Sequence, residues 1–182
     1  TGELEPTNQW YAIAKISGIK LCDALRKQYG FDGISLMPTN LYGPGDNYHL
    51  QNSHVFASFI RKFYDASKAN IPTVTCWGTG SPLREFMHVH DLGNAVLFAL
   101  EYWSPDSENA PLDSKGVPLT LLNVGTGIDI SIKDLAREIS QATGFKGKTE
   151  WDNTKPDGTF KKQLDVSKLI SLGWKPKIKL KE

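Results

Sequence analysis

The sequence predicts an α/β fold, because helical patterns alternate with short apolar runs along its 182 residues. The apolar runs lead into loops rich in glycine, proline and asparagine, as strands do when they end in irregular turns. With 40% hydrophobic and 23% charged residues, the composition is that of an ordinary globular protein. A net charge of +1 gives no global reason to expect a nucleic-acid or membrane partner, so any anionic ligand must be held by local charges.

The first helix is predicted over residues 8–29, because Asn8 is a good N-cap residue and Gly30 is a good helix stop. A short buried strand follows over residues 34–37 and runs into a turn-rich loop. Ligands of α/β sheets bind beyond the carboxyl ends of the strands. We therefore expect residues 38–41 to contact a cofactor or a substrate.

The middle of the chain combines a histidine at a helix start with a glycine-rich turn. Ser53 is expected to cap the second helix, with His54 in its first turn, where an imidazole can exchange protons. On the residues alone, a structural histidine hydrogen-bonded at the helix start is the preferred interpretation. A strand over residues 74–77 then leads to a turn that ends at Arg84. Such a turn can hold a phosphate, but glycines near a proline also occur in turns that bind nothing.

The remaining elements are predicted from caps and apolar periodicity. Asp91 is expected to cap a helix that ends near Trp103, and a polar, proline-bearing loop follows. Four further elements are expected: a buried strand (119–124), an amphipathic helix (131–143), a short exposed strand (146–151) and a last helix (165–172).

Histidines and cysteines offer no clear metal site. His88 and His90 suggest one, since alternate residues of a strand share a face, but no clustered ligands complete a coordination shell, so we expect no metal. Cys22 and Cys76 lie far apart and suit small hydrophobic side chains in a reducing compartment, with a disulfide as the less favoured alternative. No apolar run approaches the roughly 20 residues of a membrane span, so we expect a cytoplasmic protein.

Two Tyr-x-x-x-Lys pairs occur, Tyr11 with Lys15 and Tyr64 with Lys68. This spacing puts both side chains on one face of a helix, where the ammonium stabilises a phenolate and makes the phenol a proton donor or acceptor. The neighbours of the first pair are small and leave room for a flat ligand or a partner helix: Ala12, Ala14, Ser17 and Gly18. Those of the second pair are large: Phe59, Ile60 and Phe63. We therefore interpret Tyr11 as the catalytic candidate and Tyr64 as structural.

Several motifs together resemble the extended short-chain dehydrogenase/reductase family that acts on nucleotide sugars. The first three are Tyr11-x-x-x-Lys15, Pro38-Thr39-Asn40-Leu41-Tyr42-Gly43-Pro44 and Arg84-Glu85-Phe86-x-His88-Val89-x-Asp91. Three more are similar to members that epimerise and reduce a GDP-linked keto sugar: Asn52-Ser53-His54-Val55, Trp77-Gly78-Thr79-Gly80 and Lys155-Pro156-Asp157-Gly158-Thr159. The similarity runs along nearly the whole chain.

The resemblance implies the C-terminal part of a Rossmann-type doubly wound parallel sheet, interleaved with a smaller α+β substrate domain. Residues 1–45 and 88–128 would belong to the nucleotide-binding domain, and residues 46–87 and 129–182 to the substrate domain. The family's glycine-rich phosphate loop, a serine that assists the tyrosine and a cysteine that works opposite the histidine would all precede Thr1. The chain alone is therefore expected to be inactive.

The resemblance also implies an activity, which is NADP-dependent 3,5-epimerisation and 4-reduction of GDP-4-keto-6-deoxy-D-mannose by a homodimer. Tyr11 and Lys15 would be the reductase pair, and His54 the acid of the epimerisation. The residues implied in NADP binding are Tyr11, Lys15, Pro38, Thr39, Asn40, Leu41 and His54. Those implied in holding the GDP-sugar are Lys62, Trp77, Arg84 and Asp157.

This chemistry is coherent, because a C4 ketone acidifies the protons on C3 and C5 and lets an acid and a base invert both centres. Two alternatives stay open. One is another nucleotide-sugar epimerase or dehydratase of the same family, against which the Asn52-Ser53-His54 motif and the Lys-Pro-Asp-Gly turn argue. The other is an inactive association module that keeps the fold and associates through its first helix.

Overall fold

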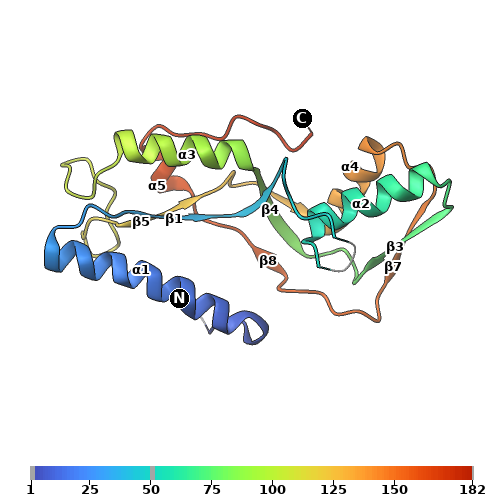
Figure 1. The fold of residues 1–182 in the computed structure, drawn as a ribbon, viewed down its shortest axis with the longest axis horizontal. Coiled ribbons are helices and arrows are strands. Elements are labelled where there is room, and N and C mark those ends of the chain that lie inside the picture. The colour runs from blue at the N-terminus through green and yellow to red at the C-terminus, as the bar shows by residue number, and fades with distance from the viewer. Residues whose placement is uncertain (1–2, 50–51, 182) are drawn as a thin grey trace.

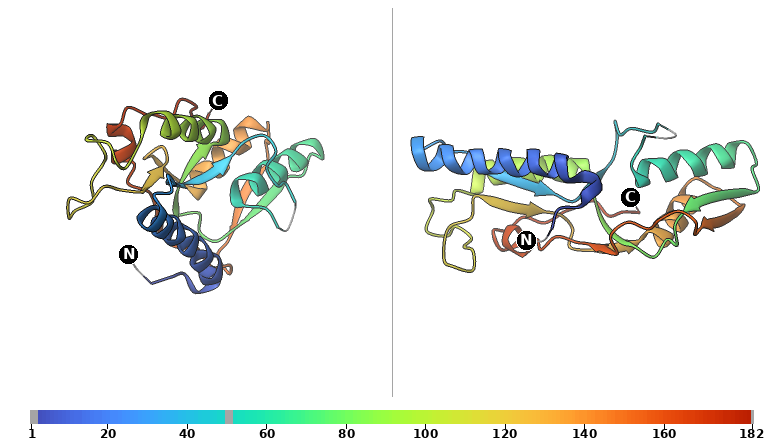
Figure 2. Two further views of the ribbon diagram at one scale, coloured as in Figure 1. Left: turned by 60° about the vertical axis from the view of Figure 1, so that its left-hand side comes forward. Right: turned by 90° about the horizontal axis from the view of Figure 1, so that it is seen from below.

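Two groups of buried side chains divide the chain into two lobes, which strand β4 (Leu83–His88) joins (Figure 1). The structure is a computed structural model and describes residues 3–49 and 52–181. The right-hand view of Figure 2 also shows that the lobes lie end to end. Helices and parallel strand pairs occur in both lobes, so the predicted α/β class is confirmed.

The first lobe is built on a parallel pair, β1 (Ser35–Pro38) with β5 (Leu121–Val124). Helix α3 (Val89–Tyr102) and helix α1 (Gln9–Tyr29) lie on opposite sides of this pair, and a short 3-10 helix (Pro6–Asn8) precedes α1 (Figure 1). Helix α5 (Ser167–Ser171) packs against β5. The buried side chains of this lobe are Met87, Ala95, Ala99, Trp103, Leu122, Val124, Leu169 and Trp174.

The second lobe pairs β3 (Thr73–Trp77) with β7 (Lys148–Asp152), again in parallel. Helices α2 (Val55–Lys68) and α4 (Ile132–Ala142) pack against each other and bury an apolar cluster rich in phenylalanine. Cys76 belongs to this cluster, and burial raises the pKa of its thiol to about 11, so the thiol stays protonated at neutral pH. Cys22 and Cys76 are both free thiols, as the favoured interpretation of the sequence required.

The junction between the lobes is made of short strands. Strand β4 pairs with β2 (Asn40–Tyr42) on one side, and with β6 (Asp129–Ser131) and β8 (Lys161–Lys162) in its first half. None of these four strands was predicted. Residues 38–47 were interpreted as a loop and residues 78–86 as a turn. Both interpretations were wrong at β2 and β4, because these strands are defined by pairing with distant segments and carry no apolar run of their own.

Two predicted helix caps were wrong. Helix α2 begins at Val55 with His54 as its N-cap residue, while the Ser53 hydroxyl is buried without a hydrogen-bond partner among the described residues. Helix α3 is capped by His88, whose Nδ1 accepts the N–H of His90 at 3.2 Å. The carboxylate of Asp91 instead accepts the backbone N–H groups of Lys177 (3.0 Å) and Ile178 (2.9 Å).

The other predicted elements are confirmed within about two residues. Helix α1 ends at Gly30, whose φ of +66° is the left-handed conformation of a helix stop. Helix α4 is capped by Ser131, whose hydroxyl accepts the N–H of Asp134 at 3.0 Å. Within the described residues, no helix has the length and apolar character needed to cross a bilayer.

Helix α1 buries none of its described side chains and is held to the first lobe by polar contacts near its C-terminal end. The Thr120 hydroxyl donates to the carboxylate of Asp23 at 2.5 Å. Arg26 pairs with Asp32 at 2.7 Å and with Asp106 at 3.0 Å. The position of α1 therefore depends on a few hydrogen bonds and ion pairs.

We predict that Thr120→Val lowers the free energy of unfolding by about 1 kcal/mol near neutral pH, the usual net value of one hydrogen bond. The Thr120 hydroxyl lowers the pKa of Asp23 below its ordinary value of 3.8. The stabilisation linked to a lowered carboxyl pKa is present above that ordinary value and is lost as the pH falls through the folded-state pKa. Denaturant unfolding should therefore show a difference between wild type and variant at pH 7 that shrinks in strong acid.

The matched control is Thr143→Val. Its hydroxyl donates to the carbonyl of Ile139 at 2.8 Å, and a carbonyl does not titrate in this range. The cost of this substitution should stay constant from pH 7 into acid. If the loss of unfolding free energy in Thr120→Val is equally constant with pH, the Thr120 hydroxyl does not lower the pKa of Asp23.

Candidate functional site

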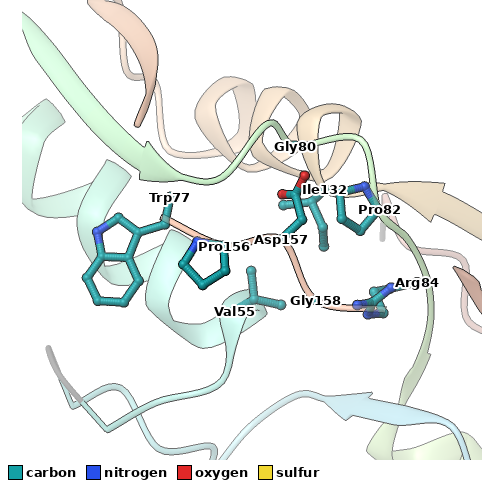
Figure 3. Close-up of a pocket in the computed structure, with 9 residues that line it drawn as sticks. All are labelled: Val55, Trp77, Gly80, Pro82, Arg84, Ile132, Pro156, Asp157 and Gly158. Atoms are coloured by element: carbon teal, nitrogen blue, oxygen red, sulfur yellow. The ribbon is translucent and has the colours of Figure 1, made fainter. Parts of the chain in front are cut away.

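A cavity of about 210 Å³ opens in the second lobe, between the end of β3, the start of β4 and residues 156–158 (Figure 3). Three of the four side chains predicted to hold a substrate line it: Trp77, Arg84 and Asp157. Val55 at the start of α2 and Ile132 at the start of α4 complete its apolar wall. Segments far apart in the sequence therefore form one site.

Trp77 is 67% exposed, and two ammonium groups lie near its indole ring. Lys62 Nζ and Lys155 Nζ are each 5.7 Å from the ring centroid, which is cation–π distance. Lys62 is the fourth predicted substrate residue. The role of Lys155 was missed, although it lies two residues before Asp157 in a quoted motif.

The positive charge around this cavity is balanced only in part, because Asp157 also lines the cavity and the Asp152 carboxylate attracts Lys155. Arg84 Nη1 donates to the carbonyl of Leu83 at 2.7 Å, and among the residues that the structure describes Lys62, Arg84 and Lys155 form no ion pair. Gly158 leaves room for the guanidinium, since a Cβ there would lie 3.0 Å from Arg84 Nη2. An exposed indole with two ammonium groups near it and a guanidinium lining the same cavity suits a flat ligand that carries phosphate.

Asp157 lines the cavity, and its carboxylate is also hydrogen-bonded to the protein. Its Oδ1 accepts the N–H of Thr79 at 2.9 Å and its Oδ2 accepts the Thr79 hydroxyl at 2.6 Å. The carboxylate therefore fastens residues 153–160 onto the end of β3. Gly78 is required for this contact, because its φ is +77° and a Cβ at this position would overlap Oδ1 of Asp157.

The two Tyr-x-x-x-Lys pairs have nearly the same local geometry. Lys15 Nζ lies 5.3 Å from the centroid of the Tyr11 ring, and Lys68 Nζ lies 5.5 Å from that of Tyr64. The pairs differ in their place in the fold. Tyr11 is 61% exposed in the first turn of α1, whose start lies near the junction of the lobes in Figures 1 and 2.

His54 is the N-cap residue of α2, and the first turn of this helix is its end nearest to the junction (Figure 1). Its side chain is exposed and makes no capping hydrogen bond. The interpretation preferred on the residues alone, a histidine hydrogen-bonded at the helix start, was therefore wrong. The imidazole is sterically available to a ligand.

Residues 38–41 lie at the carboxyl end of β1, as predicted for a segment that contacts a ligand. Two of their side chains are committed to the protein: the Thr39 hydroxyl and the Asn40 amide donate to the backbone carbonyl of Glu85, at 3.1 Å and 2.8 Å. Leu41 packs against the buried cluster of the first lobe. Pro38 is exposed.

His88 and His90 do not share the face of one strand, which was the reason to consider a metal site there. His88 ends β4 and His90 lies in α3, so the two do not alternate along one strand. Within residues 3–49 and 52–181, no group of three or more His, Cys, Asp or Glu side chains could hold a metal ion.

Parallel strand pairs covered by helices are the architecture of Rossmann-type α/β proteins. The chain belongs to the NAD dependent epimerase/dehydratase family, whose profile matches residues 1–110. It is 52% identical over its whole length to "Probable GDP-L-fucose synthase 1" of Oryza sativa subsp. japonica, covering 52% of that protein. It is 48% identical over 98% of its length to the GDP-L-fucose synthase of Escherichia coli (strain K12), covering 54% of that protein.

A solved structure of a related enzyme has the same fold as this chain. A GDP-mannoheptose C4 reductase from Campylobacter jejuni with NADP bound superposes on 99% of the chain with a TM-score of 0.81 and 32% identity, and the match covers 59% of the reductase. The chain spans about half the length of the curated relatives that it matches.

We predict that Gly78→Ala detaches residues 153–160 from β3, because the added Cβ displaces the Asp157 carboxylate from Thr79. Backbone amides of this segment should exchange hydrogen several-fold faster, measured by mass spectrometry. Gly116→Ala is the matched control, because Gly116 has the same φ of +77° and a Cβ there meets nothing within 4 Å. Both variants cost the roughly 1–2 kcal/mol of a left-handed alanine. Equal exchange of residues 153–160 in the two variants would contradict the role given to Asp157.

Proposed function

We propose that the protein containing this chain converts GDP-4-keto-6-deoxy-D-mannose to GDP-L-fucose with NADPH, by epimerisation at C3 and C5 and reduction at C4. The observation that carries the proposal is 48–52% identity to proteins named GDP-L-fucose synthase along nearly the whole chain. Because the chain spans about half of those relatives, the proposal concerns the full-length enzyme.

The cavity of the second lobe supports a GDP-sugar as the substrate. The guanine ring stacks on the exposed indole of Trp77, and Lys62 and Arg84 hold the diphosphate. Asp157 acts by closing residues 153–160 over the nucleotide. Lys155, on the same segment, adds a second ammonium group beside the indole, after that of Lys62.

The residues of α1 and of the β1 end fit NADP. An exposed phenol with an ammonium 5.3 Å from its ring centroid can hold a ribose and a carbonyl oxygen, and residues 38–41 occupy the strand end where such nucleotides bind. When bound, NADPH supplies the hydride that reduces C4. NADP bound to the C. jejuni reductase supports this choice of cofactor.

The protein's own residues then perform the proton steps. The C4 ketone acidifies C3 and C5, and the exposed imidazole of His54 acts as the acid on the face that it reaches. Tyr11 donates the proton to the C4 oxygen as the hydride arrives. Lys15 orients the ribose and stabilises the phenolate that remains.

We predict that Tyr11→Phe in the full-length enzyme lowers the rate of NADPH oxidation by roughly 10²- to 10⁴-fold, the usual cost of losing a general acid. Only a hydroxyl is removed, so folding should persist. Exchange of solvent deuterium into C3 and C5 should also persist, because it uses another acid. The variant should therefore accumulate epimerised ketone, which mass spectrometry in deuterated water detects.

Tyr64→Phe is the matched control, since Tyr64 and Lys68 share the local geometry of the first pair. It should leave NADPH oxidation and deuterium exchange near wild type. His54→Gln should show the reverse of Tyr11→Phe, with exchange impaired more than reduction. Equal losses of NADPH oxidation in the two tyrosine variants, at unchanged melting temperatures, would remove the proposed role of Tyr11.

The functional division follows the lobes in our proposal. Residues 1–45 and 88–128 serve the nucleotide cofactor, and residues 46–87 and 129–182 serve the sugar nucleotide. The two buried clusters support this division apart from Met87, Leu169 and Trp174, which belong to the second set of ranges and pack in the first lobe. The free thiols of Cys22 and Cys76 support a reducing, cytoplasmic location.

We also propose a homodimer formed through α1, which exposes a series of large apolar side chains: Trp10, Ile13, Ile16 and Leu21. The full-length enzyme should be a dimer by light scattering at micromolar concentration. Ile16→Glu should give monomers because it places a charge in the helix interface. Leu100→Glu, at an exposed apolar position of α3, should remain dimeric. Monomeric wild type would overturn the proposed interface.

A further inference from the structure

Glu85 is a buried charged residue to which the proposed mechanism gives no role. Its side chain is 0% exposed at the centre of β4, where the two lobes join. Within the described part of the chain it forms no ion pair. A carboxylate that has lost its hydration without a counter-charge must be compensated by hydrogen bonds.

Backbone N–H groups provide that compensation. Glu85 Oε1 accepts from Thr126 (2.5 Å) and Gly127 (2.9 Å), in the loop that follows β5. Oε2 accepts from Leu164 at 3.1 Å, in the segment that follows β8. Gly125 makes space for the carboxylate, because a Cβ there would overlap Oε1.

The backbone of Glu85 binds a further segment. Its carbonyl accepts from the Thr39 hydroxyl and the Asn40 amide, at the end of β1. Glu85 therefore hydrogen-bonds the segment that follows β1 and the loop that follows β5. Both lie at the carboxyl edge of the β1–β5 pair, where the cofactor is proposed to bind.

The neighbour of Glu85 belongs to the other site. Adjacent residues of a strand point to opposite faces, and Arg84 lines the cavity proposed to hold the diphosphate. Strand β8 pairs with Leu83 and Arg84, and two residues after β8 the N–H of Leu164 donates to Glu85. Glu85 therefore also helps to hold β8 in register with β4. Any displacement of Glu85 thus moves the cofactor segment relative to the substrate cavity.

We propose that Glu85 is a positioning residue that sets the distance between the cofactor and the sugar nucleotide. This inference rests on the proposed function, since it concerns the transfer between those two ligands. Hydride transfer requires the reacting atoms at about 3–3.5 Å, and a displacement of 1 Å can cost roughly 10²-fold in rate. Binding of either ligand alone needs no such distance.

The test is Glu85→Gln in the full-length enzyme. Glutamine keeps the size of the side chain, but its NH₂ group faces an N–H donor, so one hydrogen bond is lost. The single-turnover rate of hydride transfer, counted per GDP-binding site, should fall roughly 10- to 100-fold. The Kd values of GDP alone and of NADPH alone should stay within about twofold of wild type, measured by calorimetry and by NADPH fluorescence.

Thr143→Val is the control for a purely structural effect, because the Thr143 hydroxyl donates to the Ile139 carbonyl at the C-terminal end of α4, whereas the cavity is lined by Ile132 at the start of that helix. It should reduce the melting temperature and leave the rate per GDP-binding site unchanged. If Glu85→Gln does not fold, Glu85→Asp replaces it with the same measurements, since it keeps the charge and shortens the reach. A rate per site within twofold of wild type, or a loss confined to one Kd, would overturn the inference. Wild type without NADPH oxidation would remove the proposed function and this inference together.

Discussion

Burial of carboxylates at the lobe junction is the constraint on which the rest of the structure depends. Two of the places where the chain crosses between the lobes are β4 and the C-terminal segment, where Trp174 packs in the first lobe and Leu180 against the second. A buried carboxylate accompanies each of these two crossings: Glu85 lies within β4, and Asp91, only 1% exposed, accepts two N–H groups of the C-terminal segment. Buried charges held by backbone donors tolerate few alternative arrangements, because every displacement leaves a charge unsatisfied.

The helices could be predicted from the sequence because their signals are local. Gly30 provides the left-handed stop of α1, and Ser131 provides the cap of α4. The junction strands could not be predicted, because Leu83–His88 contains Arg84 and Glu85 and becomes a strand only through partners up to 79 residues away. The predicted cap at Asp91 was wrong for the same reason. The carboxylate of Asp91 accepts the backbone N–H groups of residues 177 and 178, and His88 caps the helix instead.

The candidate site was predictable to a similar extent. Trp77, Arg84 and Asp157 come together in one cavity, although the sequence separates the first from the last by 80 residues, and Lys62 joins them over the indole ring. What the sequence did not provide was the function of each side chain. Asp157 and Thr79 bind each other, Thr39 and Asn40 bind Glu85, and such pairings depend on the folded backbone.

The two halves of the proposed chemistry differ in what holds them in place. The walls of the substrate cavity rest on the phenylalanine-rich cluster of the second lobe, so the cavity is formed by packing within this chain. The reductase pair stands on α1, which buries no described side chain and is held by contacts such as that between Asp23 and Thr120. Packing defines positions more stiffly than a few exposed polar contacts do. In the proposed function, recognition of the sugar nucleotide thus depends mainly on the core of the second lobe, whereas the placement of Tyr11 depends on the polar contacts that hold α1.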